Sequence, residues 1–206
     1  MSTSVVYRSA LGYELLMRVL YGAHYTARMR AVADQVPFGS SVLELCCGPG
    51  TLYRRYLQSR AIAYIGLDVN ARFIAELRRR GVDARVVDLR RSDQPLPEAD
   101  VALMQASLYH FLPKAGELID RMLAAARERV IVSEPVRNLA SSRISIIRAV
   151  GRVAADPGVG GHAQRFNEQT LEELMARYRE RLRDQFTIPG GREKVYVLEA
   201  RAPHPA

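Results

Sequence analysis

The alternation of apolar runs with helical segments, from residue 41 to residue 136, is the feature that most constrains the fold of this chain. Runs such as "SVLELC" (41–46), "AYIGLDV" (63–69) and "RVIVSEPV" (129–136) are nearly continuous in apolar character. Continuous runs indicate strands that are buried on both faces, as in a parallel sheet covered by helices. The segments between them have helical periodicity. The sequence therefore predicts an α/β fold with a doubly wound, mostly parallel sheet of the Rossmann-like kind.

The other elements extend this pattern to seven strands. Helices are expected at 8–35 (interrupted at Gly22), 51–60, 71–81, 114–128 and 167–182, with further strands at 84–89, 99–106, 183–188 and 194–200. The last two strands flank the turn "PGGRE" and predict an antiparallel hairpin at the end of the sheet. We expect an N-terminal helical cap at 1–37, a core at 38–203, and a lid insert at 137–168 after the fifth strand.

Composition limits the class of protein. A chain of 206 residues with 48% hydrophobic and 25% charged residues is typical of a globular domain. The net charge of +8 comes mostly from arginines scattered along helices, without a basic and aromatic block of the kind that tracks nucleic acid. The N-terminus lacks the pattern of a signal peptide. Because the two cysteines are adjacent, they do not suggest a disulfide framework, and a cytoplasmic location is expected.

The segment "VLELCCGPGTLYRR" (42–55) passes from a strand into a glycine turn. The first strand-to-helix turn of an open α/β sheet lies where ligands bind, and glycines there allow close approach of the backbone. No Gly-Lys-Ser/Thr follows, which excludes a P-loop. The dinucleotide fingerprint also fails, because Thr51 or Tyr53 stands where its third glycine is required. Glu44, at the end of the strand, would repel pyrophosphate but suits a ligand with an ammonium group and a sulfonium.

This stretch resembles the first motif of class I S-adenosylmethionine-dependent methyltransferases, which has an acid followed by three alternate glycines. Later segments resemble the family's motifs in the same order. The second expected strand ends at Asp68, within "YIGLDVN", and the third ends near Asp88, within "ARVVDLR". The fourth strand and the residues after it form "ADVALMQASLYHFL". The resemblance spans residues 38–201 and includes the final hairpin. It implies a seven-stranded sheet, S-adenosylmethionine as cofactor and S-adenosylhomocysteine as product.

The resemblance also implies roles for individual residues. Asp68 would hold the ribose hydroxyls and Asp88 the adenine amino group. Val69 would pack on the adenine ring, and the Leu89 amide would face a ring nitrogen. The expected cofactor-binding residues are Glu44, Cys46, Gly48, Gly50, Asp68, Val69, Asp88, Leu89, Gln105 and Ala106, the last two at the methionine end.

Each of the three acids has a structural alternative. Asp68 could be the N-cap of the helix that starts near Ala71. Asp88 could form a surface ion pair with the arginines that follow it, and Glu44 could be a buried structural acid. Cys46 departs from the family's glycine and narrows the space beside the cofactor. Since no base or cation accompanies the two cysteines, we interpret both as packing residues and not as nucleophiles.

Catalysis and substrate are less constrained by the sequence. Methyl transfer needs alignment more than a base, and His110, just after the fourth strand, is the candidate base if one is used. Tyr13, Tyr21, Tyr25, Tyr109 and His162 are the expected substrate-side or lid residues. No His, Cys, Asp or Glu spacing suggests a metal site.

The expected function is methyl transfer to a small molecule, because no base-modification motif follows the fourth strand. Three alternatives stay open: a methyltransferase for RNA, protein or a lipid head group; peripheral membrane contact through the basic amphipathic segment 142–155; and a cofactor-binding protein without transferase activity. The methyl acceptor and the oligomeric state do not follow from the sequence.

Overall fold

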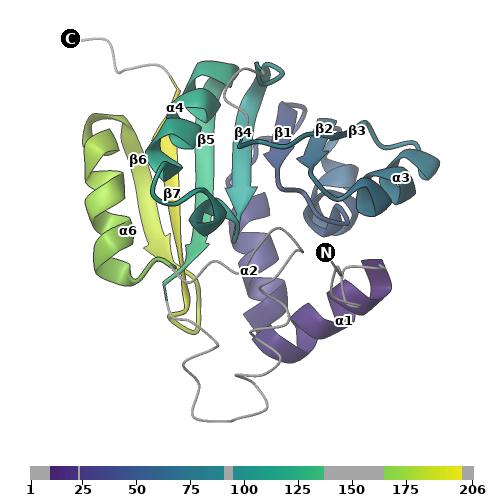
Figure 1. Cartoon of the computed structure of the whole chain (residues 1–206), viewed down its shortest axis with the longest axis horizontal. Helices are drawn as coiled ribbons and strands as arrows, with labels where there is room; N and C mark the ends of the chain where they lie inside the picture. The colour runs from purple at the N-terminus through teal and green to yellow at the C-terminus, as the bar shows by residue number, and fades with distance from the viewer. Residues whose placement is uncertain (1–9, 23, 91–94, 137–164, 201–206) are drawn as a thin grey trace.

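The computed structural model of the chain describes residues 10–22, 24–90, 95–136 and 165–200 (Figure 1). Its centre is one seven-stranded sheet with the order β3-β2-β1-β4-β5-β7-β6. The strands are β1 (Ser41–Leu45), β2 (Ala63–Asp68), β3 (Ala84–Val86), β4 (Ala99–Gln105), β5 (Ala126–Pro135), β6 (Leu182–Thr187) and β7 (Glu193–Glu199). β1 to β5 pair in parallel, whereas β7 is antiparallel to both β5 and β6. The prediction of a mostly parallel sheet that ends in an antiparallel hairpin is confirmed.

Helices cover both faces of the sheet. The α-helices are α1 (Ala10–Tyr21), α2 (His24–Ala33), α3 (Ala71–Arg79), α4 (Ala115–Ala125) and α6 (Glu168–Met175). Shorter helical segments are η2 (Tyr53–Leu57), η3 (Gln58–Arg60), η4 (Leu108–Phe111) and η6 (Ala176–Arg181). The break expected at Gly22 is present, with φ of +53° between α1 and α2.

The alternation of side chains along the central strands creates two apolar cores. Leu43 and Leu45 of β1 pack with α4 and α6 on one face, where Ile119 and Leu171 are fully buried. Val42 of β1 belongs to the core on the other face, together with Tyr25, Met29 and Val32 of α2. Both faces of β1 are thus removed from water, which explains why its sequence is an unbroken apolar run.

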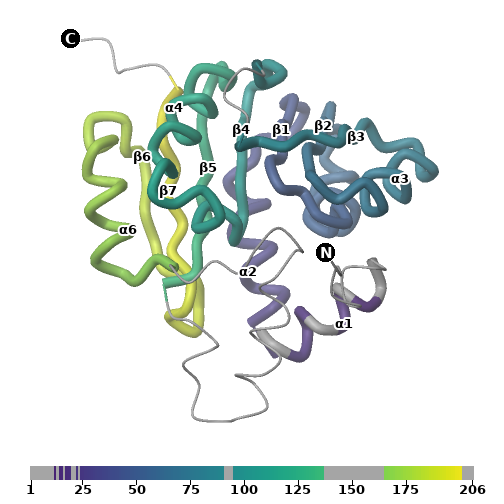
Figure 2. Tube along the Cα trace, viewed as in Figure 1, coloured from purple at the N-terminus to yellow at the C-terminus, as the bar shows by residue number. Residues whose placement is uncertain are grey.

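The N-terminal helices lie near the carboxyl ends of the parallel strands. The arrowheads of β4 and β5 point to the lower edge in Figure 1, and Figure 2 traces α1 and α2 along that lower side. Glu14 of α1 forms an ion pair with Arg55 of η2, at 2.6 Å. α2 contributes a row of buried residues at helical spacing to the second core, so this helix is part of the packed fold.

Several predicted elements differ from the structure in their bounds or their winding. β5 starts at Ala126, which pairs with Ala99, so residues 126–128 belong to the strand and not to the preceding helix. β3 ends at Val86, two residues before Asp88. The helix expected at 51–60 winds as a π-helical turn at Tyr53–Leu57 followed by a 3₁₀ turn. Strand pairing and helix winding depend on tertiary contacts, which periodicity alone does not specify.

Candidate functional site

The carboxyl ends of β1, β2 and β4 meet at one edge of the sheet. Leu45, the last residue of β1, is paired with Leu67 of β2 and with Met104 of β4, so the three strands end at the same level. From β1 the chain proceeds to β2 and β3 on one side of the sheet, whereas β4 and β5 lie on the other side of β1, so the strand order reverses at β1. Open α/β sheets bind their ligands at such a reversal of strand order. We therefore take this edge as the candidate site.

The turn after β1 has left-handed backbone torsions at three alternate positions. The φ angle is +54° at Cys46, +55° at Gly48 and +68° at Gly50. A Cβ at Gly48 would meet no atom within 4 Å, whereas a Cβ at Gly50 would lie 2.6 Å from Cδ2 of Leu77. Gly50 therefore permits close packing against α3. Gly48 leaves its backbone open to a ligand.

Cys46 stands at a left-handed position, which is unfavourable for a residue with a Cβ by about 1–2 kcal/mol. Its half-buried side chain packs against the core that contains α4 and α6. Burial raises the pKa of the Cys46 thiol well above its usual range, and the nearby Asp68 and Glu134 add to the rise. The thiol is therefore protonated at neutral pH. This geometry supports the interpretation of Cys46 as a packing residue.

Asp68 connects the glycine turn to the start of α3. Its carboxylate accepts hydrogen bonds from the amide of Gly48 at 2.8 Å and from the amide of Asn70 at 2.7 Å. Asn70 is the N-cap of α3, because its side chain accepts from the amides of Arg72 and Phe73. Burial raises the pKa of Asp68, and the bonded amides oppose that rise. The capping role that the sequence left open for Asp68 thus belongs to Asn70.

Glu44 is buried at the carboxyl end of β1. Its Oε2 accepts a hydrogen bond from the hydroxyl of Tyr64 at 2.6 Å. Burial raises the pKa of Glu44 to about 8, the negative charge of Asp68 adds to the rise, and the Tyr64 hydroxyl opposes it. Tyr64 had no role in the sequence-based expectations, since a tyrosine in an apolar strand is usually a core residue.

The residues after β2 and β3 differ in exposure. Val69 is 44% exposed, and its apolar side chain stands at the edge next to Asp68. The carboxylate of Asp88 accepts from Nε and a terminal nitrogen of Arg90, at 2.8 and 2.7 Å. The surface ion pair that the sequence left open for Asp88 is therefore present. Leu89 is buried, and its carbonyl accepts from Arg121 at 2.7 Å.

The end of β4 turns towards α2. Nε2 of Gln105 donates to the carbonyl of Arg28 at 3.2 Å and to Glu193 at 3.4 Å. Ala106 has a φ of +52°, and its amide donates to the carbonyl of Ser133 at 2.7 Å. The side chain of Gln105 is thus engaged with α2 and β7 in this structure.

His110 and Tyr109 lie on η4, directly after β4. Their rings are 4.0 Å apart, and the guanidinium of Arg165 lies 3.9 Å from the centre of the Tyr109 ring. Tyr109 is only 6% exposed, and Tyr25 only 4%. Both rings are packed in the apolar cores, and their assignment to the substrate side stays a prediction.

Glu134, at the end of β5, is a buried acid that the sequence-based reasoning missed. It is 1% exposed and accepts a hydrogen bond from the amide of Leu108 at 2.9 Å, so that it holds the start of η4. Burial raises the pKa of Glu134 to about 8, although the bonded amides and the charge of Arg165 oppose that rise. The signal was available: Glu134, like Glu44 and Asp68, is an acid near the carboxyl end of an apolar strand.

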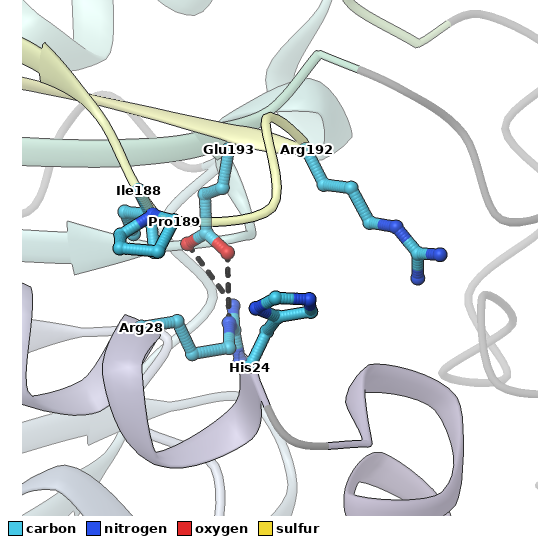
Figure 3. Close-up of a pocket in the computed structure, with 6 residues that line it drawn as sticks. All are labelled: His24, Arg28, Ile188, Pro189, Arg192 and Glu193. Atoms are coloured by element: carbon cyan, nitrogen blue, oxygen red, sulfur yellow. Dashed lines mark hydrogen bonds and ion pairs between the residues drawn. The ribbon is translucent and has the colours of Figure 1, made fainter.

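Figure 3 shows a small hollow between α2 and the β6–β7 turn, lined by His24, Arg28, Ile188, Pro189, Arg192 and Glu193. Arg28 donates two hydrogen bonds to the carboxylate of Glu193, at 2.7 and 3.1 Å. The His24 ring packs so closely on Gly190 that a Cβ there would lie 3.0 Å from it. None of the six lining residues belongs to the glycine turn. We interpret this hollow as the junction between α2 and the hairpin.

Some expected residues lie outside the described part of the structure. Tyr13 and Tyr21 belong to α1, but their side chains are not among those described, and His162 lies in the undescribed segment 137–164. In the ranges that are described, no group of three or more His, Cys, Asp or Glu residues could hold a metal ion. Within the same ranges, no helix has the length and apolar character needed to cross a membrane.

Comparison with known proteins agrees with this geometry. Residues 42–132 match a family described as a methyltransferase domain. A trans-aconitate 2-methyltransferase of Mycolicibacterium gilvum is 37% identical over 87 residues, which are 42% of this chain and 33% of that protein. The chain thus matches about a third of the length of this relative.

Solved structures with the same fold cover nearly the whole chain. A magnesium protoporphyrin IX methyltransferase from Synechocystis, with bound S-adenosylhomocysteine, superposes with a TM-score of 0.63 at 16% identity, over 95% of this chain and 96% of that one. A cyclase of the 4+2 type has the same TM-score and identity, over 87% and 82% of the two chains. At these identities the likeness shows the fold alone. The domain match over residues 42–132 and the strand order of the sheet together support the class I S-adenosylmethionine-dependent methyltransferase family for this chain.

Proposed function

We propose that this chain transfers a methyl group from S-adenosylmethionine to a small-molecule acceptor. The observation that carries the proposal is the turn at residues 46–50, with its three left-handed positions, between the acids Glu44 and Asp68. A ligand with an ammonium group and a sulfonium carries the positive charge that two buried carboxyls favour. A pyrophosphate would meet repulsion there.

The other residues at this edge are compatible with the cofactor. Asp68 uses both oxygens to hold backbone amides, but a carboxylate has about four acceptor sites, which leaves capacity for the ribose hydroxyls. The exposed side chain of Val69 would cover one face of the adenine ring. The pair between Asp88 and Arg90 is exposed and therefore weak, so Asp88 can exchange it for the adenine amino group. Cys46, Gly48 and Gly50 would line the methionine part of the cofactor, with Gln105 and Ala106 at its far end. The Leu89 amide would face a nitrogen of the adenine ring.

When bound, S-adenosylmethionine supplies an activated methyl group. The work of the chain is then to align an acceptor with that group and to exclude water. η4 stands at the edge where the acceptor would arrive, and its His110 is the proposed base for acceptors that must lose a proton.

The acceptor is proposed only as a class. The relative from Mycolicibacterium gilvum is named for trans-aconitate, which is a small organic acid. The match covers about a third of that relative. The cap at 1–37, including Tyr13, Tyr21 and Tyr25, and the insert at 137–168, including His162, are proposed to enclose the acceptor together with Tyr109. The two cysteines, Cys46 and Cys47, are free, and free cysteines favour the cytoplasm as the compartment.

Binding without turnover is the rival worth testing, because a cyclase shares the fold and fold does not imply function. Calorimetry with S-adenosylmethionine, S-adenosylhomocysteine and NAD is the first experiment. We expect both sulfur compounds to bind and NAD not to bind. The second experiment supplies methyl-labelled cofactor and a set of small organic acids, among them trans-aconitate, and measures label in the product. Tight NAD binding without binding of either sulfur compound would refute the proposal, and cofactor binding without transfer to any acceptor class would favour the non-catalytic rival.

A further inference from the structure

The side chain of Tyr64 forms a hydrogen bond directly with the side chain of Glu44. The hydroxyl donates to Oε2 of Glu44 at 2.6 Å, and both residues are buried, at 7% and 5% exposure. The two residues come from neighbouring strands. Tyr64 is paired with Val42, whereas Glu44 is paired with Gly66, so the tyrosine ring must extend along the strands to reach the carboxylate.

Gly66 provides the space for this contact. It stands opposite Glu44, where any other residue would place a side chain. A Cβ at this position would lie 2.9 Å from the hydroxyl oxygen of Tyr64 and 2.9 Å from Sγ of Cys47. Both distances are too short for real Cβ contacts. Gly66 therefore leaves free the space that the Tyr64 hydroxyl occupies.

The ring of Tyr53 packs against one face of the Tyr64 ring. The two rings are stacked, with centroids 4.1 Å apart and an angle of 17° between their planes. Tyr53 is the first residue of η2, and only Thr51 and Leu52 separate it from Gly50 of the glycine turn. The ring of Tyr64 is thus fixed between the sheet and the helical segment that leaves the site. Such packing leaves its hydroxyl little freedom.

The hydroxyl also acts on the charge of Glu44. The titratable groups that interact with Glu44 among the described residues are Tyr64, Asp68 and the thiols of Cys46 and Cys47. None of these is a cation. Burial and Asp68 raise the pKa of Glu44, and the hydrogen bond from Tyr64 is the interaction that lowers it. A donor to a carboxylate favours its ionised form.

We propose that Tyr64 is a positioning residue, which holds Glu44 as an oriented carboxylate for the ammonium group of the bound cofactor. The inference rests on the proposed function, since it presupposes that S-adenosylmethionine and S-adenosylhomocysteine bind at this edge. In this arrangement the carboxylate of Glu44 binds the ammonium group of the ligand, and the hydroxyl of Tyr64, on the next strand, donates a hydrogen bond to that carboxylate.

Tyr64→Phe removes the hydroxyl and keeps the stacked ring. We expect about tenfold weaker binding of S-adenosylhomocysteine at pH 7, the loss of one hydrogen bond to a charged group. The affinity should rise with pH in both proteins, and the rise should lie at higher pH in the variant. Methylthioadenosine lacks the ammonium group, so its affinity should not change. Tyr53→Phe removes the neighbouring hydroxyl and serves as the matched control, with affinities for both ligands unchanged.

The outcomes separate this inference from the proposed function. Equal losses for S-adenosylhomocysteine and methylthioadenosine, or a loss that is the same at every pH, would mean that Tyr64 is only structural. No loss at all would also overturn the inference. If the wild-type chain binds neither ligand, the proposed function itself fails. Gly66→Ala, whose new Cβ displaces the Tyr64 hydroxyl, is an independent variant and should reproduce the selective loss. In a Glu44→Gln background, Tyr64→Phe should have no further effect on affinity.

Discussion

Arg28 of α2 and Glu193 at the start of β7 form a bidentate ion pair between residues 165 positions apart in the chain. Both side chains are almost fully buried, at 3% and 2% exposure. Oε1 of Glu193 also accepts from Ser133 at 2.5 Å and from Gln105 at 3.4 Å. The pair therefore connects the N-terminal helix to β4, β5 and β7 at the carboxyl edge of the sheet.

We expect that Arg28→Met destabilises the fold by about 3–5 kcal/mol, because it leaves a buried carboxylate without its partner. Urea denaturation measures this free energy of unfolding. Arg18→Met is the control, since Arg18 is 52% exposed and its pair with Glu14 should contribute less than about 1 kcal/mol. Adding Glu193→Gln to Arg28→Met should recover part of the loss. Similar small effects of Arg28→Met and Arg18→Met would show that the buried pair is unimportant.

Asp68→Ala should weaken S-adenosylhomocysteine binding by about 1.5–3 kcal/mol, or roughly tenfold to a hundredfold, as expected for a charged hydrogen-bond acceptor. It would also release the amides of Gly48 and Asn70. Asn70→Ala is the matched variant: it should cost about 1 kcal/mol of stability as a lost helix cap and leave the affinity nearly unchanged. Calorimetry and thermal unfolding distinguish the two. Unchanged affinity in Asp68→Ala would reduce Asp68 to a structural residue.

Cys46→Gly should keep cofactor affinity within about tenfold and change stability by less than about 1 kcal/mol. The relief of the left-handed torsion at Cys46 is offset by the backbone entropy of glycine and by lost packing. Cys46→Val provides the contrast, because a β-branched residue at the same torsion should be clearly destabilising. A Cys46→Gly variant that binds cofactor but has lost all methyl transfer would indicate a chemical role for the thiol.

Stability should fall as pH rises from about 5 to above 8. Glu44 and Glu134 have pKa values raised from 4.5 to about 8 in the folded chain. Between these values the folded chain binds more protons than the unfolded chain, so raising the pH favours unfolding. Thermal unfolding of the cofactor-free protein at several pH values measures this slope. Glu134→Gln should reduce it, whereas Glu128→Gln, at the exposed start of the same strand, should not. A slope that Glu134→Gln leaves intact would contradict the assignment.

Local patterns in the sequence determined the architecture. Strands buried on both faces have no polar side to show, so β1, β2, β4 and β5 were visible as continuous apolar runs. The candidate site could be predicted for a second reason: a parallel sheet brings the carboxyl ends of its strands to one edge. The turn at Gly48 and Gly50 and the acids Glu44 and Asp68 were therefore expected at that edge. Their contacts at this edge agree with that expectation.

Only the tertiary structure decided which side chains meet. Tyr64 and Glu44 look like an ordinary core tyrosine and a motif acid until strand register and the missing side chain of Gly66 bring them together. The burial of Tyr25 in the second core depends on how α2 packs against the sheet. Nothing in the sequence marks Arg28, one of many scattered arginines, or Glu193, the last residue of "PGGRE", as half of a buried ion pair. Their pairing depends on the packing of two elements far apart in the sequence, and no local pattern carries that information.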